Sequence, residues 1–125
     1  MHALRNIHTA LVRDGLLVDT QPIGPRPRVS LDGHELGTLD MREWGETIRA
    51  VDERVDETIA AGLYERTVER TVVVRSAFDD GPDCLEVTGA WQGTRVPRPI
   101  ATRLAAIRDP VTLDQQVRLR VFRRH

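Results

Sequence analysis

The sequence predicts one small domain over residues 1–125, of the α/β or α+β class, with three helices, about four main strands and a small hairpin. Its 125 residues are enough for one hydrophobic core, and the 40% apolar and 30% charged content is ordinary for a globular chain. A long stretch after Asp40 has apolar residues every three or four positions, which is typical of an amphipathic helix. The C-terminal stretch alternates apolar and polar residues, which is typical of a strand.

The first 37 residues are expected to form a helix, a strand and a hairpin. Apolar residues at positions 4, 7, 11 and 12 share one helical face, and Gly15 ends that helix. Leu16-Leu17-Val18 is typical of a short strand, and a proline-rich loop covers residues 21–28. Asp32-Gly33 between alternating apolar residues predicts a tight hairpin, which we expect to be peripheral because its arms are short.

A long helix is predicted from Asp40, which can cap its N-terminus together with Glu43, as in a capping box. Four acidic residues at 52, 53, 56 and 57 fall along this helix. Such carboxylates can bind a metal or transfer protons, but a stripe of this kind is more often the solvated face of an amphipathic helix, and we favour that interpretation. The apolar face comprises Trp44, Ile48, Val51, Val55, Ile59 and Leu63.

The remaining chain is expected to contain two strands that pair antiparallel. Residues 72–78 are rich in valine, residues 79–83 predict a turn, and a helix entered through Pro97 and Pro99 follows a stretch without a clear pattern. In residues 111–121 the odd positions are mostly apolar and the even positions are polar. The even face, including Arg118 and Arg120, is therefore predicted to lie in solvent.

Several classes of function are disfavoured. A net charge of −1 argues against nucleic-acid binding, and the apolar stretches are too short to span a membrane, so we expect a cytoplasmic protein. No glycine-rich nucleotide fingerprint is present, and the histidines at 2, 8, 34 and 125 lack metal-ligand spacing, so no metal is expected. Cys84 lies near Asp83 and Glu86, which would raise its pKa and disfavour a reactive thiolate. The chain thus contains no complete active site.

Residues 4–19 resemble a late segment of class I S-adenosylmethionine-dependent methyltransferases, in which a helix ends in a Pro-Gly-Gly-like turn and leads into the fifth strand. The corresponding turn here reads Arg13-Asp14-Gly15. The resemblance implies the C-terminal half of such a domain, a partial methyltransferase-like sheet whose last two strands form the family's antiparallel hairpin. The half that binds S-adenosylmethionine would precede Met1, so no cofactor is expected for this chain alone.

Three functions follow as hypotheses. The chain is a methyltransferase-like remnant that acts by binding or oligomerisation, as a homodimer or with a partner protein joined at the sheet edge of residues 16–19. Alternatively, it is a subunit or fragment of an active methyltransferase whose S-adenosylmethionine site is completed by another chain. The third hypothesis is an unrelated α+β ligand-binding domain with a pocket under the long helix. An all-antiparallel sheet would favour this third hypothesis, and a parallel first strand would favour the other two. Candidate pocket or interface residues are Trp44, Tyr64, Trp91, Arg118 and Arg120.

Overall fold

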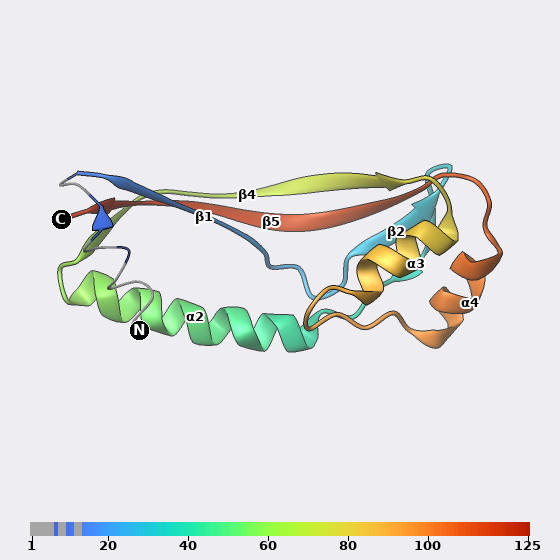
Figure 1. The fold of residues 1–125 in the computed structure, drawn as a ribbon, viewed down its shortest axis with the longest axis horizontal. Helices are drawn as coiled ribbons and strands as arrows, with labels where there is room; N and C mark the ends of the chain where they lie inside the picture. The colour runs from blue at the N-terminus through green and yellow to red at the C-terminus, as the bar shows by residue number, and fades with distance from the viewer. Residues whose placement is uncertain (1–6, 8–9, 12–13) are drawn as a thin grey trace.

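The computed structural model describes residues 7, 10, 11 and 14–125, and these form an α+β fold with a five-stranded, wholly antiparallel sheet and three helices (Figure 1). The predicted α+β class and the antiparallel C-terminal strands are confirmed. In chain order the elements are β1 (Leu16–Pro22), β2 (Arg28–Leu31), β3 (His34–Thr38), α2 (Arg42–Ala60), β4 (Tyr64–Phe78), α3 (Gly81–Gly89), α4 (Arg98–Ala106) and β5 (Val111–Arg124).

The helix expected near the N-terminus lies mostly outside the described residues. Within them, the amide of Leu11 donates a hydrogen bond of 2.9 Å to the carbonyl of Ile7, which is the spacing of an α-helical turn. Leu11 packs against the cluster formed by Val55, Tyr64 and Phe122.

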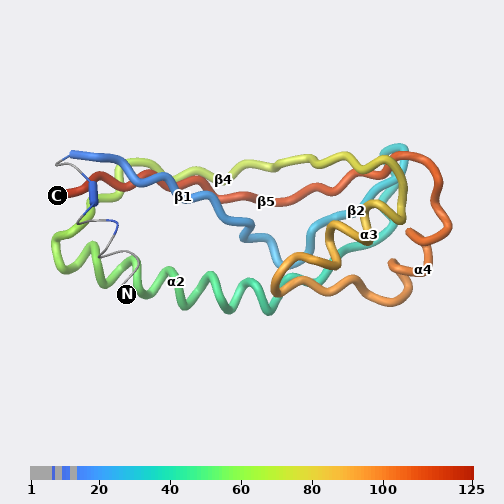
Figure 2. The backbone as a smooth tube through the Cα atoms, in the orientation of Figure 1, coloured from blue at the N-terminus to red at the C-terminus, as the bar shows by residue number. Residues whose placement is uncertain are grey.

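Strand β5 is the centre of the sheet (Figure 2). It pairs with β4 along nearly its whole length on one side. On its other side it pairs with β1 near its C-terminal end and with β2 near its N-terminal end, and β3 extends the sheet beyond β2. Strand β1 runs antiparallel to β5, and β1 and β4 are outer strands of the described sheet.

The sheet has two separate apolar cores, one near each end. In the view of Figure 1, α2 lies below one end of the β4–β5 ribbon, and α3 and α4 lie below the other. The core near α2 contains Val55, Tyr64 and Phe122. The core near α3 and α4 comprises Val29, Leu39, Phe78, Cys84, Ile100, Leu104, Val111 and Leu113.

The predicted alternation of β5 holds only at its start. Val111 and Leu113 are buried, as expected for odd positions, but further along Arg120 and Phe122 are each only 2% exposed. The prediction that the even positions face solvent is therefore wrong for this half of the strand. No register shift interrupts the β4–β5 pairing between Val68 and Phe78, so we attribute the change of buried face to the twist of this long ribbon rather than to a bulge.

The hairpin is not peripheral. Asp32 and Gly33 have φ angles of 49° and 77°, as the predicted tight turn requires. However, β2 also pairs with β5, and Val29 at its centre is fully buried. A short strand thus contributes to the core because it lies between β3 and β5.

Two boundaries differ from prediction for local reasons. The turn expected at 79–83 is the start of α3, because the Asp80 carboxylate accepts a hydrogen bond of 2.8 Å from the Asp83 amide and caps the helix. Helix α2 begins at Arg42 with Met41 as its N-cap residue, one residue later than the cap predicted at Asp40. The Asp40 carboxylate still accepts a bond of 3.0 Å from the Arg42 amide.

Candidate functional site

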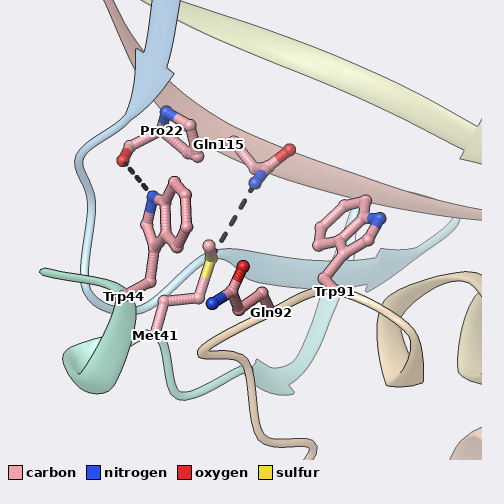
Figure 3. A pocket seen from close by; sticks show the side chains of 6 residues that line it. All are labelled: Pro22, Met41, Trp44, Trp91, Gln92 and Gln115. Carbon is pink, nitrogen blue, oxygen red and sulfur yellow. Dashed lines mark hydrogen bonds between the residues drawn. The ribbon is translucent and has the colours of Figure 1, made fainter. Parts of the chain in front are cut away.

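The candidate site is a cavity of about 360 Å³ near the start of α2 (Figure 3). Trp44 and Trp91 stand on opposite sides of it, and Met41, Gln92 and Gln115 lie between them. The six lining residues are Pro22, Met41, Trp44, Trp91, Gln92 and Gln115.

Four separate parts of the chain bring these residues together. The start of α2 contributes Met41 and Trp44, and the loop after α3 contributes Trp91 and Gln92. The end of β1 and the middle of β5 supply the other two residues. The indole N–H of Trp44 donates a hydrogen bond of 3.1 Å to the carbonyl of Pro22, which holds the ring in one orientation.

Backbone hydrogen bonds fasten the loop after α3 to the start of α2. The amides of Asp40 and Arg95 donate to each other's carbonyls at 2.8 and 2.7 Å, and the amide of Trp44 donates to the carbonyl of Gly93 at 3.2 Å. Gly93 has a φ of 69°, and a Cβ atom there would lie 2.7 Å from the backbone nitrogen of Trp44. The loop approaches the helix this closely because the residue is glycine.

The lining of the cavity suits a neutral, flat molecule. None of the six lining residues carries a charge, and the two indoles offer large apolar faces for stacking. The amides of Gln92 and Gln115 each offer both hydrogen-bond donors and an acceptor. The Gln115 amide nitrogen lies 3.9 Å from the Met41 sulfur, a weak contact that a better acceptor on a ligand can replace.

The candidate aromatic residues separate into two places. Trp44 and Trp91 line the cavity together, but Tyr64 lies in the core near α2, edge-on to Phe122 with ring centroids 6.4 Å apart. Tyr64, predicted as a pocket or interface residue, therefore does not line this cavity, and burial raises the pKa of its hydroxyl. Pro22, Met41, Gln92 and Gln115 were not predicted, since no spacing in the sequence connects them.

Arg118 and Arg120 belong to an ion-pair network beneath the sheet rather than to an open surface. Arg118 binds the Asp52 carboxylate through two nitrogens at 2.8 and 2.9 Å. Arg120 lies 2.8 Å from Asp19 and 3.0 Å from Asp52, and its guanidinium sits 5.2 Å from the centre of the Phe122 ring. The network joins α2, β1 and β5, and its two positive charges match its two negative charges.

Asp52 thus differs from the solvated stripe that the sequence predicts for it. Burial by itself would raise its pKa, but the hydrogen bonds and charges of Arg118 and Arg120 outweigh burial and lower it. Elsewhere, Arg42 lowers the pKa of Asp40 to about 2, and Arg75 lowers that of Asp114.

These lowered pKa values predict that acid destabilises the fold. A carboxylate whose pKa is lower in the folded state stabilises that state above its unfolded pKa of about 4, and the stabilisation is lost as the pH falls through the folded value. We expect the free energy of unfolding, measured in urea, to decline as the pH falls from about 4 toward 2. Asp52→Asn should flatten this decline, and an unchanged slope in that variant would show that Asp52 does not contribute.

Other chemistry has little support in the described part of the chain. Cys84 is fully buried, and burial together with Asp83 raises its pKa to about 11, in the direction that the sequence predicts. Among the described residues, no group of three metal-binding side chains comes together, and no helix is long and apolar enough to cross a membrane. Comparisons with known proteins found no matching family model, curated protein or solved structure.

Proposed function

We propose that this chain is a ligand-binding domain that holds a small, neutral and largely flat apolar molecule between Trp44 and Trp91. The observation that carries the proposal is that two indoles and two glutamine amides from different elements line one cavity. Its volume of about 360 Å³ lies within the range of small-molecule sites, which combine mostly apolar walls with a few polar groups.

The arrangement of the sheet supports this function over the two methyltransferase-related hypotheses. All pairings of the described strands are antiparallel, as the α+β ligand-binding hypothesis expects, whereas the other two hypotheses expect a parallel first strand. The resemblance to methyltransferases remains a prediction. S-adenosylmethionine carries a sulfonium and an ammonium group, and no carboxylate lines the cavity to pair with them.

The test is a fluorescence titration with N-phenyl-1-naphthylamine, a neutral, apolar probe with a flat naphthalene ring. The chain has two tryptophans and both line the cavity, so tryptophan emission reports on this site alone. We expect saturable quenching, and a dissociation constant at least about tenfold higher in Trp91→Ala, because one stacking face is lost.

Val87→Ala is the matched control, because Val87 is an exposed residue of α3 and does not line the cavity. It should bind the probe as the unmodified protein does. Equal affinity in Trp91→Ala, or tight binding of S-adenosylmethionine in place of the probe, would contradict the proposal.

We also propose that the chain self-associates as a homodimer. The observation that favours this is a run of exposed apolar side chains on the outer strand β4, where Val72, Val73 and Val74 are 48%, 66% and 41% exposed. A run of exposed apolar side chains on an outer strand marks an interaction site on many proteins.

A further inference from the structure

The outer edge of β4 is the longest unpaired strand edge in the described part of the chain. Strand β4 has 15 residues and pairs only with β5. Its residues 66–75 are all exposed, so neither face of this stretch is covered. A long exposed edge presents a row of backbone donors and acceptors that another strand can pair with.

The middle of this edge lacks most of the features, such as proline and β-bulges, that prevent an edge strand from pairing with another chain. Val72, Val73 and Val74 are 48%, 66% and 41% exposed, and no proline interrupts β4. The one register shift in β4 lies between Arg66 and Val68, so the strand is regular from Val68 onward. Charged residues flank the valines on both sides, and the order of these charges determines which strand can pair with this edge and in which register.

Resting on the homodimer proposed above, we propose that its two copies pair through β4, antiparallel, with the two-fold axis at Val72. Two antiparallel strands joined by a two-fold axis place one residue opposite its own copy, and the residues at equal distances on either side then face each other. With the axis at Val72, Glu69 of each copy faces Arg75 of the other. The dimer therefore gains two opposite-charge pairs, one on each side of the contact between the two copies of Val72.

Other positions of the axis are less favourable. An axis at Glu69, Arg70 or Arg75 would place that charge opposite its own copy, and an axis at Val68 would place Arg66 opposite Arg70. Like charges directly opposite each other destabilise a strand pair. Axes at positions 71, 73, 74 and 76 bring no charges opposite each other. Among positions 68–76, Val72 is the axis that pairs opposite charges without opposing like ones.

The side chains that form these pairs remain accessible. Arg75 binds Asp114 at 2.8 Å, yet its side chain is mostly exposed, and Glu69 touches Arg66 at 3.3 Å near the surface. The outer edge of β1 cannot form such opposite-charge pairs with its own copy, because β1 carries Asp19 and no basic residue. None of the residues proposed for the interface lines the cavity, so the proposed dimer and the proposed ligand site are independent of each other.

The test is the mass of the full chain in solution, measured by sedimentation equilibrium over a range of concentrations. We expect a monomer–dimer equilibrium whose dissociation constant rises at least about tenfold in Val72→Lys, which places two cations at the axis. Val18→Lys is the matched control, because Val18 is a similarly exposed valine on the opposite edge of the sheet and its replacement should leave the equilibrium unchanged. Circular dichroism checks that each variant is folded.

Two further variants test the register itself. Glu69→Arg should weaken the dimer, and the double variant Glu69→Arg, Arg75→Glu should recover it, since the charges are exchanged and remain opposite. Val72→Cys should form a disulfide-linked dimer under mild oxidation, since directly opposed residues lie close enough for a disulfide and Cys84 is buried. A protein that stays monomeric up to about 100 μM, a concentration far above the dissociation constant of a specific dimer, would overturn the proposal. Equal weakening by Val18→Lys and Val72→Lys would also overturn it.

Discussion

Replacing Arg120 with alanine is expected to lower the free energy of unfolding by about 3 kcal/mol. Arg120 is almost fully buried and lies within 3.0 Å of both Asp19 and Asp52. Its removal leaves two carboxylates short of a positive partner and also removes the guanidinium that packs on Phe122. We expect the lower end of the range for a broken buried ion pair, because both carboxylates still reach water and Arg118 still binds Asp52.

The matched control is Arg66→Ala. Arg66 pairs with Asp56 at 3.5 Å and with Glu69 at 3.3 Å, but these side chains are exposed, so the loss should stay below about 1 kcal/mol. Urea denaturation at pH 7 measures both variants. If Arg120→Ala costs no more than Arg66→Ala, the buried network contributes little to the stability of the fold.

The second large effect is expected from Gly93→Ala, which should cost about 3 kcal/mol and weaken probe binding in the cavity. An alanine at a φ of 69° is strained, and its Cβ would overlap the backbone of Trp44 at 2.7 Å. Relief of that overlap requires the loop to move away from α2. Because this loop carries Trp91 and the helix carries Trp44, the same movement separates the two walls of the site.

Gly62→Ala separates backbone strain from overlap. Gly62 has a similar φ of 78°, but nothing lies within 4 Å of a Cβ placed there. It should therefore cost only about 1–2 kcal/mol, the penalty of a left-handed alanine, and leave probe binding unchanged. Equal losses of stability and binding in the two variants would show that the contact between Gly93 and Trp44 does not position the site.

Local patterns predicted most of the elements. The apolar spacing from Trp44 onward identified α2, and Asp32-Gly33 identified the hairpin, because both signals depend only on neighbouring residues. Helix α3 was missed although its signal is also local. An aspartate before Gly81-Pro82 fits a helix N-terminus as well as a turn, and the contact from Asp80 to the Asp83 amide decides between them.

The candidate site was predictable only in part. Trp44 and Trp91 stood out because the chain has few aromatic residues, and both line the cavity. Gln115 carries no such signal, since a glutamine in a strand becomes a lining residue only through the position of that strand. Arg120 was assigned to solvent because strict alternation assumes that a strand keeps one buried face along its whole length.

The sequence by itself determined the class of the fold, the long helix, the hairpin turn and the antiparallel C-terminal strands, because periodicity and turn chemistry are properties of adjacent residues. Tertiary structure alone decided which face of β5 is buried and which four segments enclose the cavity. The physical reason is that the twist of a long ribbon and the cover provided by α2, α3 and α4 depend on contacts between residues far apart in the chain. Because of those contacts, Arg118 and Arg120 do not face solvent as predicted. They form a largely buried ion-pair network with Asp19 and Asp52.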